Sequence, residues 1–167
     1  MPAWRVSLPK YGWQQLDDSD HVLKPNAINL ATLQKNLQNH NIFMHFLPLA
    51  LNDGYQMLSF NAGNSEAGTI STNGTVHIAA MGPDDLLSNQ SSDFIKIDVE
   101  GGKIAALNGA TRLITRCRPV QAVSFYSRPQ VLWEIPQLLR VMCHDYQLFL
   151  CQHYYNSFDS VLCAVPH

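Results

Sequence analysis

One segment constrains the fold of this 167-residue chain more than any other: DFIKIDVEGGKIAALNGATRLI, residues 93–114. Residues 94–99 are rich in β-branched side chains, which predicts a buried strand. Apolar residues at helical spacing predict a helix over residues 103–114, and Glu100-Gly101-Gly102 connects the two. A strand that passes directly into a helix is typical of α/β proteins that contain a parallel sheet.

The rest of the chain shows the same alternation of strands and helices. The pattern predicts, in order, a helix at 26–39, strands at 42–51, 56–60 and 75–80, a short helix at 83–87, a strand at 119–126, a helix at 135–142 with Pro136 in its first turn, and two final strands at 146–151 and 160–165. We expect the last two strands to pair antiparallel. Length and element order together predict a single three-layer α/β domain, with a mostly parallel sheet and a C-terminal antiparallel hairpin.

Composition argues against several classes of function. Only 14% of the residues are charged, the net charge is -2 and no Lys/Arg cluster occurs, so we expect no nucleic-acid partner. No segment approaches the roughly 20 apolar residues of a membrane span, and the first residues lack the apolar region of a signal peptide. The expected location is therefore the cytoplasm, with no membrane partner.

The spacing of the cysteines and histidines does not match any metal-binding motif. The four cysteines form no CxxC pair and lie among apolar residues, so buried thiols are expected rather than disulfides or a zinc site; they are Cys117, Cys143, Cys151 and Cys163. The seven histidines show no paired-ligand motif. We therefore expect no metal site.

The candidate catalytic residues come at the end of the predicted strand 94–99. Ligands of open α/β sheets bind beyond the carboxyl ends of the strands. Side chains alternate along a strand, so Lys96 and Asp98 share one face, and Glu100 follows directly. Two charges on a central strand are costly to bury without a partner or a task. The residues alone leave two interpretations equally open: a structural ion pair between Lys96 and Asp98, or a functional site.

Several segments, in a fixed order, resemble a known family. They are DFIKIDVEG with the helix that ends in LNGA, then PVQAVSFYSRPQVLWEIPQLL and SVLCAV, and upstream LKPNAINLATLQKNLQNHN, FLPLALND and PDDLL. Over residues 22–166 this pattern is similar to the FkbM family of S-adenosylmethionine-dependent methyltransferases. The resemblance implies the class I methyltransferase fold, which is Rossmann-like. It also implies O-methylation of a small-molecule acceptor, through a hydroxyl group of a sugar or related natural product.

The resemblance further implies roles for individual residues. Asp98 and Glu100, tuned by Lys96, would orient or deprotonate the acceptor hydroxyl. Ala50 and Leu51 come after the family's third strand and would lie near the adenine of S-adenosylmethionine. These roles are expectations from the family and do not follow from spacing or composition.

The chain departs from the family pattern on the side expected to hold the cofactor. The family opens with a strand and a glycine-rich turn of the type DVGANxG, whereas residues 1–23 contain only Gly12. Lys24 stands where the family has an acidic residue for the ribose hydroxyls, and a cation cannot accept those hydrogen bonds. Lys103 and Ser127 replace a glutamate and a histidine of the family. We therefore expect this chain alone to bind S-adenosylmethionine poorly.

These departures predict a domain whose N-terminal strand and helix are truncated. We divide the chain into a divergent segment, residues 1–21, and a partial FkbM-like domain, residues 22–167. A parallel sheet without its middle strand would leave two rows of backbone groups unpaired. Either residues 4–8 fill the position, or the remaining strands close up, or another chain completes the sheet, as in an oligomer.

Two rival functions stay open beside the methyltransferase. The first is a degenerate, non-catalytic relative that acts as a binding or assembly module, which the departures at the cofactor side favour. The second is an enzyme, such as a hydrolase, that uses Asp98 and Glu100 without a nucleotide cofactor. No hydrolytic triad or nucleophile motif supports the second.

Overall fold

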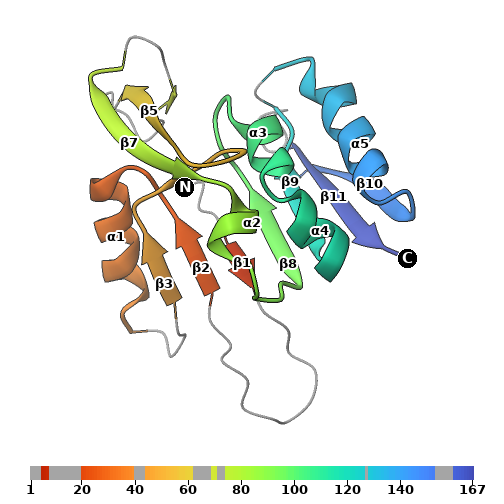
Figure 1. Ribbon diagram of the computed structural model, residues 1–167, viewed down its shortest axis with the longest axis horizontal. Helices are drawn as coiled ribbons and strands as arrows, with labels where there is room; N and C mark the ends of the chain where they lie inside the picture. The colour runs from red at the N-terminus through yellow and green to blue at the C-terminus, as the bar shows by residue number, and fades with distance from the viewer. Residues whose placement is uncertain are drawn as a thin grey trace.

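The computed structural model describes residues 5–7, 20–39, 44–61, 69–70, 74–126, 128–152 and 160–167. Within these ranges the strands form a main sheet of seven strands and a small sheet of four (Figure 1). The strands of the main sheet follow one another in space in the order β10 (Tyr146–Gln152), β11 (Ser160–Pro166), β9 (Val120–Ser124), β8 (Phe94–Ile97), β1 (Arg5–Ser7), β2 (Asp20–Leu23) and β3 (Met44–Leu47).

The strand directions agree with the predicted sheet. β2 pairs parallel with β3, and β8 pairs parallel with β9. β1 is antiparallel to both β2 and β8, and β11 is antiparallel to both β9 and β10. Consequently β2, β3, β8, β9 and β10 all run in one direction. The mostly parallel, Rossmann-like sheet with an antiparallel C-terminal hairpin is confirmed.

The central position of the sheet is filled by β1, which corresponds to the first of the three alternatives that the sequence left open. Arg5 pairs with Lys96 and Ser7 pairs with Phe94 of β8, so backbone groups that would otherwise be unpaired have partners. The strand runs opposite to its neighbours, however. Ser7, its last residue, therefore lies at the amino end of β8, whereas the ligand edge of the sheet is at the carboxyl end.

The small sheet follows β3, and its strands have the spatial order β4 (Ala50–Leu51), β7 (Val76–Met81), β5 (Gln56–Asn61) and β6 (Thr69–Ile70). The single buried strand expected over residues 42–51 is wrong, because β3 and β4 belong to different sheets and β3 is only half-buried. Pro48 lies between them. Proline has no N–H to donate to a strand ladder, so the strand ends before it.

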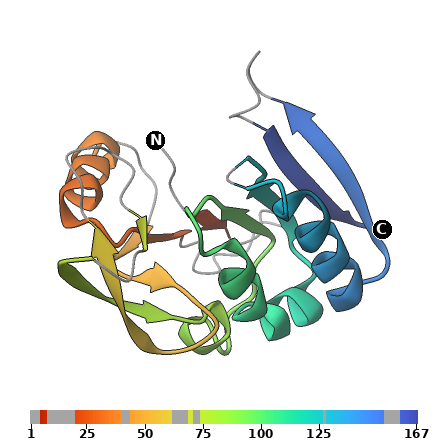
Figure 2. The same ribbon diagram turned by 90° about the horizontal axis from the view of Figure 1, so that it is seen from above.

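The helices lie on both faces of the main sheet. Figure 2 shows α1 (Ala27–Leu37) on one side and α3 (Lys103–Asn108), α4 (Thr111–Cys117) and α5 (Val131–Met142) on the other. The short α2 (Pro83–Leu86) leads from the small sheet to β8. Asn26 begins α1 as predicted, since its Oδ1 accepts from the backbone N–H groups of Ile28 and Asn29 at 3.0 and 3.1 Å. No helix within the described ranges has the length and apolarity that a bilayer crossing requires.

The helix expected over residues 103–114 is instead two helices, α3 and α4, which separate at Gly109. A Cβ atom at Gly109 would lie 2.1 Å from the backbone oxygen of Asn52, just after β4. The Gly109 carbonyl also accepts from the backbone N–H of Asp84 at 2.8 Å, and the Asp84 carboxylate accepts from two backbone N–H groups of α4 at 2.8 and 2.7 Å. The break therefore lets the small sheet and α2 pack against the helices.

The helix expected over residues 135–142 begins earlier, at Val131, so Pro136 lies inside α5 rather than in its first turn. Proline at that position removes the hydrogen bond to the carbonyl of Leu132. Leu132 is 52% exposed, so water can take the place of the missing donor. The predicted start was wrong because proline is most common at the first position of a helix, so Pro136 suggested that the helix begins next to it and not at Val131.

The main core lies between the sheet and α3, α4 and α5. Its fully buried side chains include Ile97, Leu107, Leu113, Ile114, Val123, Ile135 and Leu139. All four cysteines are free thiols, but only Cys143 is buried and the other three are half-buried. The expectation of four buried thiols was therefore wrong for three of them, because β10, β11 and the end of α4 lie at the margins of the core.

Candidate functional site

The candidate site lies where two neighbouring parallel strands, β8 and β9, end. Asp98 directly follows β8, and Tyr126 lies two residues beyond β9. Because the two strands pair in parallel, both residues leave the sheet at the same edge. The phenolic O–H of Tyr126 donates to Oδ1 of Asp98 at 3.0 Å. This bond holds the carboxylate in place and leaves Oδ2 as a further acceptor.

Lys96 accompanies Asp98 on the same face of the sheet, as the alternation of side chains predicted. Its Nζ lies 4.0 Å from Oδ2 of Asp98, and the two side chains are 37% and 10% exposed. A charge-assisted hydrogen bond is shorter, about 2.7–2.9 Å. Partly exposed ion pairs also contribute little to folding. The ion pair is therefore a weak one, and the two interpretations, a structural pair and a functional site, both stay open.

Lys103 is buried beneath this pair, with only 2% of its surface exposed. Its Nζ donates to the backbone oxygen of Val99 at 2.8 Å and lies 5.3 Å from the ring centroid of Tyr126, within cation–π range. Burial lowers the pKa of Lys103, while the charges of Glu100 and Asp98 act in the opposite direction. Lys103 therefore contacts both Val99, just after β8, and the ring of Tyr126.

Glu100 completes the acidic side of the site. It is half-buried and precedes Gly101, which has a φ of +76°. Only glycine adopts this left-handed conformation without strain, so the turn from β8 into α3 depends on it. The charge of Glu100 opposes the lowering of the Lys103 pKa by burial, as does that of Asp98. The predicted residues Lys96, Asp98 and Glu100 thus share one region with Lys103; their catalytic roles stay predictions.

Ala50 and Leu51, expected near an adenine, form β4 and pair with Ala80 and Met81 of β7. They are only 3% and 4% exposed. Their side chains therefore pack in the interior, and their cofactor role stays a prediction.

The three residues that depart from the family pattern lie in different surroundings. Lys24 directly follows β2, is half-buried, and donates its backbone N–H to the oxygen of Leu47 at 3.0 Å. It places a cation at the edge formed by the carboxyl ends of β2 and β3. Lys103 is described above. Ser127 lies outside the described residues.

Sequence reasoning missed two features of the site, the contact from Tyr126 and the burial of Lys103. The first could have been found, because Tyr126 follows the strand that pairs parallel with β8. The second also had a signal. Position 103 lies one helical turn before Leu107, on the side that faces the core, so the helical period itself predicts burial. The charge of a lysine ordinarily indicates exposure, and it concealed this signal.

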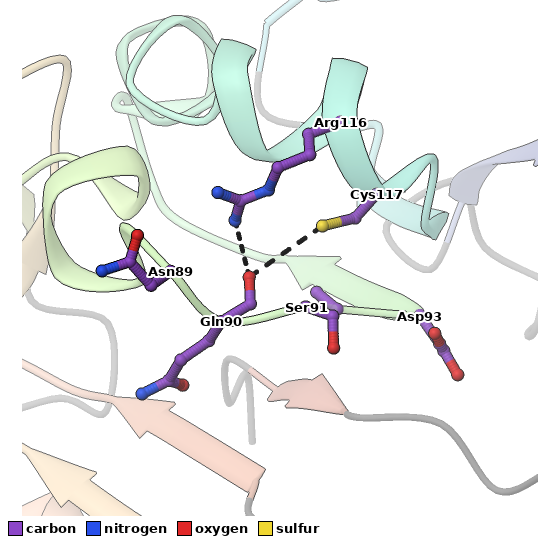
Figure 3. A pocket seen from close by; sticks show the side chains of 7 residues that line it. Asn89, Gln90, Ser91, Asp93, Arg116 and Cys117 are labelled. Carbon is purple, nitrogen blue, oxygen red and sulfur yellow. Dashed lines mark hydrogen bonds between the residues drawn. The ribbon is translucent and has the colours of Figure 1, made fainter.

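A cavity of about 360 Å³ lies at the opposite, amino end of β8. It is lined by Asn89, Gln90, Ser91, Ser92, Asp93, Arg116 and Cys117 (Figure 3). Arg116 donates to the backbone oxygens of Ser88 and Gln90, both at 2.6 Å, and the Cys117 thiol contacts the latter at 3.9 Å. The guanidinium therefore holds the loop before β8, and we assign this cavity a structural role.

Comparisons with known proteins agree with this fold and with the order of its segments. The family profile described as Methyltransferase FkbM domain matches residues 10–155. Among solved structures, the crystal structure of methyltransferase FkbM from Methylobacillus flagellatus KT is similar, with a TM-score of 0.69 and 24% sequence identity. The similarity covers 85% of this chain but 35% of that chain. No match was found among curated proteins. Because the family profile matches most of its length, the chain belongs to the FkbM methyltransferase domain family.

Proposed function

We propose that the chain provides the acceptor side of an FkbM O-methyltransferase, which methylates a hydroxyl group of a sugar or related natural product. The observation that carries the proposal is the 3.0 Å hydrogen bond from Tyr126 to Asp98 at the carboxyl end of β8. It fixes a carboxylate at the sheet edge where ligands of such folds bind.

Asp98 is the proposed general base. A hydroxyl oxygen becomes a better nucleophile when its proton is removed, and help of this kind contributes about 10²–10⁴-fold to a rate. Tyr126 occupies Oδ1 of the carboxylate. Oδ2 then accepts the proton of the acceptor hydroxyl, and the ammonium of Lys96 lies 4.0 Å from this oxygen.

Glu100 and Lys103 have supporting roles in the proposal. Glu100, half-buried beside the turn, is placed to accept a hydrogen bond from a second hydroxyl of the acceptor. Neighbouring hydroxyls are what a sugar offers. Lys103 is a positioning residue, since its ammonium lies 5.3 Å from the Tyr126 ring and is fixed by Val99.

The described residues do not fit the methyl donor that the family implies, S-adenosylmethionine. Lys24 stands at the carboxyl end of β2, where a carboxylate would bind the ribose hydroxyls. Ala50 and Leu51 are buried. Ser7 ends β1 at the amino end of β8, so β1 does not lead into a turn at the ligand edge. We propose that the chain alone binds the donor weakly, and that a second copy or a partner chain supplies the donor side.

Two measurements test these statements. Isothermal calorimetry of the chain with S-adenosylmethionine should show binding weaker than micromolar; micromolar affinity would refute the weak donor side. Transfer of a radiolabelled methyl group, at millimolar donor, should be detectable with some member of a panel of free sugars and glycosides. It should depend on Asp98 but be unaffected by Asp85→Asn, a change in a carboxylate whose side chain is 55% exposed on α2.

The second candidate function is a non-catalytic binding or assembly module. The reversed direction of β1 and the cation at position 24 favour it, because both lie on the donor side. The same assay separates the two. Sugar binding in ligand-observed NMR without any methyl transfer, in the presence of millimolar donor, would support the module and exclude methyl transfer by this chain alone.

A further inference from the structure

Two of the free cysteines lie on the last two strands of the main sheet, Cys151 on β10 and Cys163 on β11. In the register of β10 with β11, Phe149 is opposite Cys163 and Cys151 is opposite Val161. Residues opposite each other in a sheet share a face, and so do residues two apart along a strand. Cys151 and Cys163 are therefore diagonal neighbours on one face of the hairpin.

The two thiols are near each other and only half-buried. Burial raises the pKa of Cys163 to about 11, and the neighbouring Cys151 contributes in the same direction. Both side chains are half-buried, neither is in a disulfide, and β10 is the last strand at its end of the main sheet. The helices α3, α4 and α5 pack on the opposite face, where Leu162 and Ala164 are buried. A small solute can therefore approach the pair.

The spacing of the pair suits a bridging ion better than a direct disulfide. Diagonal neighbours in an antiparallel pair are about 7–8 Å apart, whereas the Cα atoms of a disulfide are about 4.4–6.8 Å apart. An ion between the sulfurs adds two bonds of about 2.3 Å, the length of zinc–thiolate bonds. It can therefore link the thiols without displacing the strands.

The number of ligands limits the kind of ion. Within the described residues, no group of three or more His, Cys, Asp or Glu side chains could hold a metal, so the three or four ligands of a zinc site are not provided there. Thiolates are soft ligands that select soft cations such as Cu(I). We propose that Cys151 and Cys163 form a two-thiolate site for a soft monovalent cation of the Cu(I) class.

The binding step releases protons in a fixed ratio. Two thiols and one monovalent cation give a dithiolate complex with a net charge of -1 and two protons, and no electron is transferred. Binding should therefore tighten as the pH rises, because the thiolate is the ligand. The proposed site shares no residue with the proposed methyltransferase site, and in the strand register Ala122 of β9 lies between Cys163 and Lys96.

The test is an anaerobic titration of the reduced full chain with Cu(I), supplied as its acetonitrile complex and competed with bicinchoninate. We expect wild type to take one equivalent. Cys151→Ser and Cys163→Ser should each weaken binding at least 100-fold, whereas Cys117→Ser and Cys143→Ser should leave it unchanged. Equal affinity of the Cys151→Ser variant and wild type, or no competition by wild type, would overturn the proposal.

A second probe keeps the test valid if a serine variant unfolds. Phenylarsine oxide loses its oxygen as water when it forms one cyclic adduct with two adjacent thiols. Mass spectrometry of the folded wild type should show one such adduct, and peptide mapping should locate it on Cys151 and Cys163. An adduct on any other pair, or none, would contradict the proposed geometry.

Discussion

The two halves of the main sheet differ in how completely they are packed. In the C-terminal half, defined as β8, β9, β10 and β11 with α3, α4 and α5, residues such as Ile97 and Ile135 are 1% and 0% exposed. In the N-terminal half, defined as β1, β2, β3 and α1, β2 is buried, but β3 is half-exposed and Leu30 is the buried residue of α1, while Ile28 is 77% exposed. The proposed acceptor residues lie on the C-terminal half and the proposed donor edge on the N-terminal half. A well-packed framework therefore supports the residues that we propose to bind the acceptor.

The largest effect is expected from Asp98→Asn, which tests whether the chemistry belongs to the C-terminal half. Asparagine retains an oxygen for the Tyr126 O–H but cannot take a proton, so methyl transfer should fall about 10²–10⁴-fold while the melting temperature changes little. Initial rates with radiolabelled donor and a thermal unfolding curve measure both. Undiminished transfer would remove Asp98 from the mechanism.

Truncation of one isoleucine in each half tests the packing difference directly. Ile135→Ala should lower the free energy of unfolding by about 2–5 kcal/mol, because it opens a cavity in the core. Ile28→Ala should change it by less than about 0.5 kcal/mol, since the side chain is largely exposed. Urea unfolding followed by circular dichroism compares the two. Similar costs would show that Ile28 is packed against the protein and not exposed.

Gly109→Ala tests the joint between the small sheet and the helices of the C-terminal half. The new Cβ would overlap the backbone oxygen of Asn52, so a destabilisation of about 1–3 kcal/mol is expected. Gly54→Ala is the matched control, because nothing lies within 4 Å of its Cβ position and it should cost less than about 0.5 kcal/mol. Equal unfolding midpoints for the two variants would show that the small sheet does not press on α3 and α4.

The smallest expected effect is a loss of stability at acidic pH, which tests the N-terminal half through His21. Burial lowers the pKa of His21 below its ordinary 6.5, assisted by His45, whose ring stacks on it with centroids 4.8 Å apart, and opposed by Asp20. The unfolded state then binds the proton more readily. Stability should be complete above about pH 6.5 and decline as the pH falls toward the lowered value.

Unfolding free energies at pH 7.5 and 5.5 measure this decline. It cannot exceed about 1.4 kcal/mol for every pH unit that separates the pKa of His21 in the folded protein from that in the unfolded chain. His21→Phe keeps an aromatic ring against His45 and should remove this part of the decline. An unchanged difference between the two pH values would assign the acid sensitivity to other groups.

Much of the architecture could be predicted because it depends on local patterns. The structure confirms the strand β8, the helix start at Asn26 and the antiparallel pairing of the last two strands. Lys96 and Asp98 share a face because side chains alternate on any strand, whatever its neighbours are. The family resemblance rested on the same ordered segments, and the match over residues 10–155 confirms it.

The errors concern contacts between segments that are distant in the sequence. The break at Gly109 depends on the backbone of Asn52, which directly follows β4 in the small sheet. The early start of α5 depends on the exposure of Leu132 to solvent. The burial of Lys103 depends on the ring of Tyr126 and on the oxygen of Val99. None of these is fixed by a residue and its near neighbours in the chain.

The amino-acid order by itself therefore determined which elements form, their succession and the family, because periods of 2 and 3.6 residues are properties of the local backbone. Tertiary structure decided that β1 enters the middle of the sheet in the reverse direction, and that Cys151 and Cys163 become neighbours. Pairing direction and cross-strand proximity follow from satisfying backbone hydrogen bonds and burying apolar area between remote segments, and both are settled only when the whole sheet assembles.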